Sequence, residues 1–147
     1  MDINDDNPMW LQQFIDTYQS LNIDNVDLIK DIYHPNVTFE DPLHKVEGND
    51  SLQMYFNRLY QNLLHCEFTI HHPFVKNDEA CIYWTMTFIH SKLNAGQSIT
   101  VQGHSHLKGD DDKVIYHRDY LDVGAMLYEH IPVLGGVVRF LKNKASQ

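Results

Sequence analysis

Two carboxylates and one histidine are the side chains of this chain best placed for acid–base chemistry. Asp41 follows an apolar strand expected at 37–39 and precedes Pro42. Because proline restricts the preceding residue to extended conformations, Asp41 is expected at a strand terminus. His117 and Asp119 lie two residues apart in a later strand, so their side chains share a face and can form a carboxylate–imidazole pair. Beside an apolar cavity, either carboxylate is a candidate proton-transferring base. The alternatives are that Asp41 only initiates a turn and that His117 and Asp119 form an ordinary polar pair on a solvated sheet face.

The size and charge of the chain restrict its class. With 147 residues it is expected to form a single domain, residues 1–147, with a sizeable core. A net charge of −9 excludes a nucleic-acid partner, because phosphate binding needs clustered Lys and Arg. No apolar run approaches the roughly 20 residues of a membrane-spanning helix. The acidic start of the chain lacks the basic and apolar regions of a signal peptide, which predicts a cytoplasmic protein.

Three helices are expected in the first part of the chain. The first begins at Asn7-Pro8, a capping residue followed by proline, and carries an apolar stripe that includes Trp10, Phe14 and Tyr18. The second runs over 24–33 and is ended by Pro35. The third begins at Asn49 or Asp50, and its apolar stripe extends to Leu63.

From residue 66 the apolar period becomes alternating, which predicts strands at 66–75, 79–91, 97–108 and 113–122 joined by turn sequences. Helices followed by consecutive hairpins indicate an α+β fold, with three N-terminal helices packed on one face of a curved antiparallel sheet. In the hairpin, Cys66 would lie opposite Ile89 and Cys81 opposite Phe74, too far apart for a disulfide. Both cysteines are therefore expected to be reduced, buried thiols.

The segment 123–147 is expected to extend the core, 8–122, with a short C-terminal helix. Its apolar stripe favours packing on the domain or on a twin subunit, because apolar faces are usually covered. A lid over a pocket and a foot on a membrane surface are the alternatives. Membrane contact is not expected, since the stripe is short and few cations flank it.

Four segments resemble the cone-shaped family that includes ketosteroid isomerase, SnoaL-like polyketide cyclases and nuclear transport factor 2. They are IYHPNVTFEDP at 32–42, VEG at 46–48, WTMTF at 84–88 and KVIYHRDYLD at 113–122. With the order of the expected elements, three helices and then a curved sheet, the resemblance covers about residues 8 to 122, nearly the whole domain. The resemblance implies a cone-shaped fold. It implies less about function, because this scaffold carries enzymes and non-enzymes alike.

The resemblance also implies roles for particular residues. Asp41 falls on the general base of the isomerase, whereas its oxyanion-hole tyrosine falls on Thr17, with Tyr18 adjacent but about 100° around the helix. The second oxyanion donor, a protonated aspartate, falls on Ser105 or His104, and neither reproduces it, which argues against steroid isomerisation. In SnoaL-like cyclases the acid–base residue lies on the final strands, where Asp119 and His117 match.

By the same resemblance, the strand face of Trp84 and that of His117 line the cone. The expected pocket is an apolar bowl with a few convergent polar groups, as in most small-molecule sites. Its apolar walls would be Tyr55, Trp84, Met86 and Phe88. A three-histidine metal site, combining His104 and His106 with His90 or His117, is not expected, because the strand faces separate the first two from the others.

Three functions stay open at this level. The first is a cofactor-independent enzyme of isomerase, cyclase or dehydratase type that acts on a small hydrophobic or polyketide-like molecule, with Asp41 or Asp119 as base and His117 as acid or orienting group. A related variant would use these carboxylates to activate water against an epoxide. The second is a non-catalytic module that binds a hydrophobic ligand. The third is a homodimer assembled through the outer sheet face, with these contact residues: Tyr83, Thr85, Tyr116, Arg118 and Tyr120.

Overall fold

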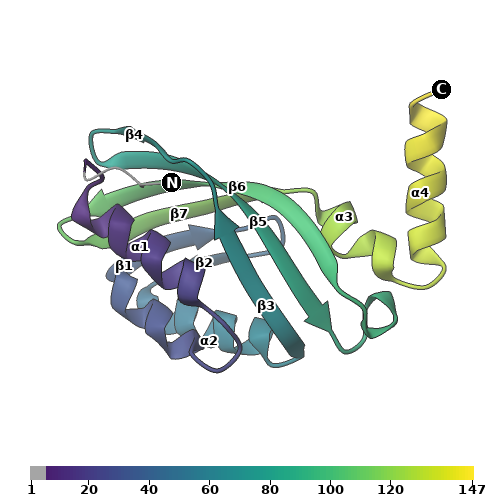
Figure 1. The fold of residues 1–147 in the computed structure, drawn as a ribbon, viewed down its shortest axis with the longest axis horizontal. Coiled ribbons are helices and arrows are strands. Elements are labelled where there is room, and N and C mark those ends of the chain that lie inside the picture. The colour runs from purple at the N-terminus through teal and green to yellow at the C-terminus, as the bar shows by residue number, and fades with distance from the viewer. Residues whose placement is uncertain (1–5) are drawn as a thin grey trace.

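A computed structural model describes residues 6–147 and shows an α+β fold in which helices cover the hollow side of a curved sheet (Figure 1). The predicted fold class is therefore confirmed. The helical elements, in chain order, are α1 (Met9–Ser20), η1 (Val26–Ile32), α2 (Asn49–Tyr60), η2 (Asn94–Gly96), α3 (Val123–Met126), η3 (Tyr128–His130) and α4 (Leu134–Ala145).

The strands form one seven-stranded sheet in the order β2-β1-β7-β6-β5-β3, with β4 paired to β5. Their bounds are β1 (Tyr33–Glu40), β2 (Lys45–Glu47), β3 (Leu63–Ile70), β4 (Phe74–Lys76), β5 (Glu79–His90), β6 (Ile99–Asp110) and β7 (Lys113–Leu121). The sheet is mixed rather than purely antiparallel, because β1 pairs in parallel with β7. A parallel pair needs a long crossover connection, and the chain between β1 and β7 supplies it.

The second expected helix forms, and the expected role of Pro35 needs correction. The second helix is a 3₁₀ helix, η1, in keeping with the use of this tighter helix as a short connector. Pro35 does not end a helix but lies inside β1, where the pairing with β7 is irregular between Tyr33 and Thr38. Proline is tolerated at such irregular positions because no ladder hydrogen bond is lost there.

The N-terminal helix also starts differently from the prediction. Pro8 is the N-cap residue and no side chain caps the helix, while the Asn7 amide donates to Gln12 at 3.2 Å. The predicted stripe is nevertheless buried: Trp10, Phe14 and Tyr18 all lie in the core. α1 thus covers the sheet through the side chains that its helical period placed on one face.

The pairing of β5 sets which side chains face the helices. Trp84, Met86 and Phe88 face the hollow side, as alternation predicted. Cys66 pairs with Phe88 rather than Ile89, because residues 71–73 interrupt the ladder between β3 and β4, whereas Phe74 pairs with Cys81 as predicted. Both cysteines are free thiols, but only Cys66 is buried and Cys81 is partly exposed.

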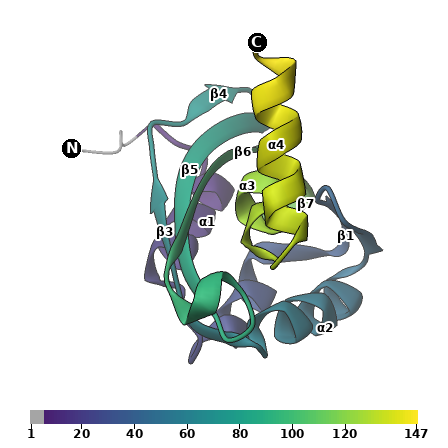
Figure 2. The same cartoon turned by 90° about the vertical axis from the view of Figure 1, so that its right-hand side faces the viewer.

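The C-terminal helix α4 projects away from the sheet (Figures 1 and 2). Lys142 holds it to the preceding segment through ion pairs with Asp122 at 3.1 Å and Glu129 at 3.3 Å. Apolar side chains of this region stay in solvent, among them Val133, 87% exposed, and Phe140, 64% exposed. The expected packing on the domain is therefore not seen within this chain. Of the helices described, none combines the length and the apolar character needed to cross a membrane.

Candidate active site

The concave side of the sheet and the helices α1 and α2 enclose a cavity of about 360 Å³. Its wall is largely aromatic and aliphatic, with a few polar side chains from β6 and β7. It includes these predicted residues: Tyr18, Asp41, Tyr55, Trp84, Met86, Phe88, Ser105, His117 and Asp119. The structure thus brings together, at one cavity, carboxylates that are 78 positions apart by residue number, 41 against 119.

Two predicted residues do not reach this cavity. Thr17 is the neighbour of Tyr18 in α1, and a single helical step of about 100° turns it away while Tyr18 faces inward. His104 lies on the outer face of β6 and stacks on Tyr120, with ring centroids 5.0 Å apart. Because side chains alternate along a strand, the inward position belongs to Ser105.

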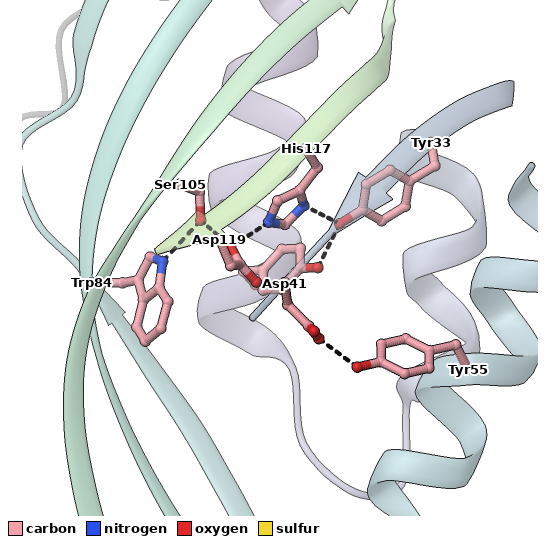
Figure 3. Close-up of polar contacts among 8 residues, drawn as sticks. Tyr33, Asp41, Tyr55, Trp84, Ser105, His117 and Asp119 are labelled. Carbon is pink, nitrogen blue, oxygen red and sulfur yellow. Dashed lines mark hydrogen bonds and ion pairs between the residues drawn. The ribbon is translucent and has the colours of Figure 1, made fainter. Parts of the chain in front are cut away.

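Asp119 is held by two hydrogen-bond donors on the same oxygen (Figure 3). Its Oδ1 accepts from Ser105 Oγ at 2.5 Å and pairs with His117 Nε2 at 2.6 Å. Trp84 Nε1 donates to Ser105 Oγ at 2.9 Å and so fixes the hydroxyl rotor from behind. Neighbours on β5, β6 and β7 thereby hold one edge of the carboxylate.

A second chain of hydrogen bonds continues behind His117. Its Nδ1 lies 2.7 Å from the Tyr33 hydroxyl, which lies 2.6 Å from the Tyr18 hydroxyl. One direction of donation satisfies every group: Tyr18 donates to Tyr33, Tyr33 donates to Nδ1, and Nε2–H donates to Asp119. His117 is thereby locked in one orientation and one tautomer.

The other carboxylate oxygen of Asp119, Oδ2, receives no hydrogen bond from any residue in the described range 6–147. The Asp119 side chain is 19% exposed, whereas that of His117 is 3% exposed. Since Asp119 also lines the cavity, Oδ2 is the oxygen available to a ligand. A carboxylate fixed on one edge and open on the other has the arrangement of a general base.

Asp41 has a different environment, although it lines the same cavity. Its Oδ1 accepts from the backbone N–H groups of Leu43 and His44, both at 2.8 Å, and its Oδ2 accepts from the Tyr55 hydroxyl. Aspartate commonly stabilises turns in this way. Both oxygens are engaged, so Asp41 stabilises the 41–44 turn, and Asp119 is the carboxylate with an oxygen open to the cavity.

The sequence profile of one family matches residues 11–117, which is most of the chain. The chain belongs to the SnoaL-like domain family. No curated protein gives a significant match.

Several solved structures share this SnoaL-like fold at low sequence identity. A protein described as a SnoaL-like polyketide cyclase from Jannaschia sp. CCS1 is 15% identical, with a TM-score of 0.70 over 86% of this chain and 94% of that one. TerC, co-crystallised with polyporic acid, is 13% identical, with a TM-score of 0.70 over 81% and 95%. An LEH-like epoxide hydrolase of M. tuberculosis is 17% identical, with a TM-score of 0.64 over 80% and 79%.

The histidines of this SnoaL-like domain do not gather into a metal site. His106 pairs with Glu79 at 3.0 Å on the outer face, His104 stacks on Tyr120, and His117 faces the cavity. Within the part of the chain that the structure describes, no three His, Cys, Asp or Glu side chains are placed to hold a metal ion.

Sequence reasoning missed Tyr33, which anchors His117. It was expected to be the last residue of a helix, whereas the structure makes it the first residue of β1. The spacing of the residues around Tyr33 does not indicate this role. Tyr33 and His117 are 84 residues apart in the chain, and the parallel pairing of β1 with β7 brings them together. A tyrosine a few residues before a predicted strand was the one available signal.

Burial perturbs several acidic side chains around the cavity. It raises the pKa of the hydroxyls of Tyr18, Tyr33 and Tyr60 well above the ordinary tyrosine value. The pKa of Tyr55 is raised by burial and by its hydrogen bond to Asp41. Burial also raises the pKa of the Cys66 thiol to about 11. All five groups are therefore neutral in the folded protein near pH 7.

These shifts predict loss of stability in alkali. The unfolded chain loses its thiol protons above the ordinary value of 9.0, whereas folded Cys66 keeps its proton to about 11, so unfolding becomes easier as pH rises through this window. Cys66 alone is expected to lower the unfolding free energy by about 2–3 kcal/mol above pH 11. Urea unfolding measured from pH 8 to 11 tests this, with tyrosinate absorbance appearing together with unfolding.

Cys66→Ala is the informative variant, because it removes the thiol. Between pH 9 and 11, the variant should show a shallower slope of the unfolding free energy against pH. The difference in slope should correspond to about one proton. An unfolding free energy that stays constant across that window in the wild type would contradict the prediction.

Proposed function

We propose that this protein is an acid–base catalyst, of isomerase, cyclase or dehydratase type, for a small hydrophobic or polyketide-like molecule. One observation carries the proposal: Asp119 has one oxygen fixed by Ser105 and His117 and the other open to an apolar cavity. The names of two relatives, one described as a polyketide cyclase and one crystallised with polyporic acid, agree with a small-molecule pocket. A cytoplasmic setting and independence from cofactors belong to the same proposal.

In this mechanism Asp119 Oδ2 removes a proton from a carbon next to a carbonyl of the ligand. The C–H electron pair moves into the carbonyl and forms an enolate. Return of the proton to another carbon gives isomerisation. Attack of the enolate carbon on a second carbonyl of the ligand, whose C=O π pair moves to its oxygen and takes up the proton, gives cyclisation. Departure of a β-hydroxyl, which takes up the proton and leaves as water, gives dehydration. His117 keeps the Asp119 carboxylate oriented throughout. Its imidazole N–H stabilises the ionised form of Asp119, which is present before Asp119 takes the proton and after it returns the proton.

The apolar walls contribute by positioning the ligand and excluding water. Trp84, Met86 and Phe88 form one side of the cavity, and Tyr55 closes it from α2. Exclusion of water leaves Asp119 Oδ2 free to meet the C–H group of the ligand, because no solvent hydrogen bond competes for this oxygen. A ligand of mainly apolar surface suits this lining.

A second candidate function is binding without catalysis, and one observation favours it. The hydroxyls of Tyr18, Tyr33 and Tyr55 are all engaged with protein acceptors, so none of them is directed at an oxyanion in the ligand. An acid–base catalyst without a donor from these three tyrosines would depend on the ligand itself, or on the Tyr60 hydroxyl, which lines the cavity and accepts from Cys66, to stabilise the enolate. Turnover therefore decides between the two candidates.

The test uses 5-nitrobenzisoxazole, a small neutral compound that needs only a base. Its ring C–H loses a proton, the N–O bond breaks as the nitrile forms, and a coloured phenolate leaves. We expect the protein to accelerate this elimination with saturation kinetics, and an apolar dye bound in the cavity to inhibit it competitively. Binding of the dye without any acceleration would support the non-catalytic module and overturn the enzyme.

We also propose a homodimer assembled through the outer face of the sheet. Tyr83 and Tyr120 are nearly half exposed there, and the His104 ring lies between them. It stacks on Tyr120, with centroids 5.0 Å apart, and is tilted against Tyr83, with centroids 5.3 Å apart. A continuous aromatic surface of this kind is enriched in protein interfaces.

Sedimentation velocity at micromolar concentration is expected to report a dimer for the wild type and a monomer for Tyr120→Asp, because a buried unpaired charge opposes association. Tyr128→Asp is the matched control, since Tyr128 is exposed to a similar extent on η3, outside the sheet face. A wild type that sediments as a monomer would exclude the dimer.

A further inference from the structure

The cavity continues into a shallow surface groove along α2. Three residues line both hollows: Tyr55, Arg58 and Leu59. The groove is completed by the segment 44–47 and Ser51. The last turn of α2 is therefore the place where the apolar interior meets the surface groove.

Arg58 is the only arginine in the described range 6–147 without a protein partner. The two others are engaged: Arg118 pairs with Glu40 at 2.9 Å, and Arg139 donates to the Glu129 carbonyl at 2.7 Å. Arg58 forms no hydrogen bond or ion pair with described residues, although the chain carries a net charge of −9. A guanidinium at a cavity mouth has five N–H donors to offer to a ligand.

The charges near Arg58 leave its positive charge uncompensated. Glu47, across the groove, is engaged by Lys45 at 3.7 Å and by the Thr38 hydroxyl at 2.9 Å. Asp41, inside the mouth, already accepts from two backbone N–H groups and from Tyr55. The groove therefore presents Arg58 beside carboxylates that have other partners, with Lys45 already paired to Glu47.

We propose that the natural ligand is an amphipathic organic acid, whose apolar body fills the cavity and whose single anionic group pairs with Arg58 at the mouth. The proposal rests on the proposed function in that the same cavity holds the reacting molecule. An anionic group taken into an apolar cavity without a partner would be strongly disfavoured. Arg58 removes this penalty, because its planar fork binds an oxyanion through two parallel hydrogen bonds.

The arrangement also orients the ligand. An anion near Asp119 would be repelled by its carboxylate, whereas the mouth lies beside a cation. The anionic end therefore stays at α2, and the apolar end carries the reacting C–H group towards Asp119 Oδ2. Arg58 is in this sense a specificity-determining residue and takes no part in proton transfer.

Two dyes with one carbon skeleton test the inference. 1-Anilinonaphthalene-8-sulfonate is anionic, and N-phenyl-1-naphthylamine is the same molecule without the sulfonate. We expect the two dyes to compete for the wild-type cavity. Arg58→Gln should weaken binding of the sulfonate roughly tenfold and leave binding of the neutral dye within about twofold. Added sodium chloride should weaken only the sulfonate in the wild type.

Lys76→Gln is the matched control, because it removes the same charge from exposed β4 and should change neither dye. Equal weakening of both dyes by Arg58→Gln would show that Arg58 only shapes the cavity, and no weakening would show that it does not meet the anion. Either result overturns the inference. Neither result touches the proposed proton transfer, because 5-nitrobenzisoxazole carries no anionic group and reports on Asp119 separately.

Discussion

Asp119→Asn is expected to lower the rate of 5-nitrobenzisoxazole elimination by about 10²–10⁴-fold, the usual contribution of a positioned general base. The asparagine side chain has nearly the same shape and still accepts hydrogen bonds from Ser105 and His117 through its carbonyl oxygen. Its amide nitrogen, in the place of Oδ2, cannot take a proton from carbon. The loss should therefore appear in kcat, while the affinity for a neutral apolar dye is maintained.

Asp41→Asn separates the two candidate bases. Since both oxygens of Asp41 are occupied by Leu43, His44 and Tyr55, we expect a loss of less than about tenfold, through the shape of the mouth. Asp16→Asn, on the exposed side of α1, is the surface control and should not affect the rate. If Asp41→Asn were as damaging as Asp119→Asn, the assignment of the base to β7 would be wrong.

Phe39→Ala is expected to lower the free energy of unfolding by about 3–5 kcal/mol, the range for truncating a buried phenylalanine. The Phe39 side chain is 1% exposed, and its ring centroid lies 4.8 Å from that of His117 and 5.3 Å from that of Phe56. Its removal would leave a void between β1, β7 and α2. Chemical denaturation gives the free energy directly.

The matched control is Phe140→Ala, the same truncation on α4. Phe140 is 64% exposed, so little apolar surface returns to water, and the change should stay within about 0.5 kcal/mol. A loss at Phe140 comparable to the loss at Phe39 would mean that α4 packs against something in solution, and a second copy of the chain would be the first partner to examine.

Much of the architecture could be predicted because its signals are local. The helical period of Trp10, Phe14 and Tyr18 identified the buried face of α1, and alternation identified the inward side chains of β5 and β7. Errors arose where local and tertiary preferences compete. Pro35, which was expected to end the second helix, lies within a strand whose pairing is irregular, and the helix ends before it at Ile32.

The candidate site could be predicted only in part. His117 and Asp119 were paired correctly, because two residues in one strand must share a face. Whether Ser105 or His104 faces the cavity depends on the register of β6. The resemblance fixed this register only to within one residue. The choice between Asp41 and Asp119 needed the hydrogen bonds of each carboxylate oxygen, and spacing carries no information about them.

The amino-acid sequence by itself determined which elements form and which side of each element is apolar. Both depend on the spacing of apolar side chains along the chain, which is every two residues on one face of a strand and every 3.6 residues on one face of a helix. Only the tertiary structure decided which of the polar groups meet. Tyr33 reaches His117 through the parallel pairing of β1 with β7, and Arg58 reaches the cavity mouth through the packing of α2. Such contacts join segments far apart in the chain, and their geometry is set by the packing of the whole domain rather than by any local pattern.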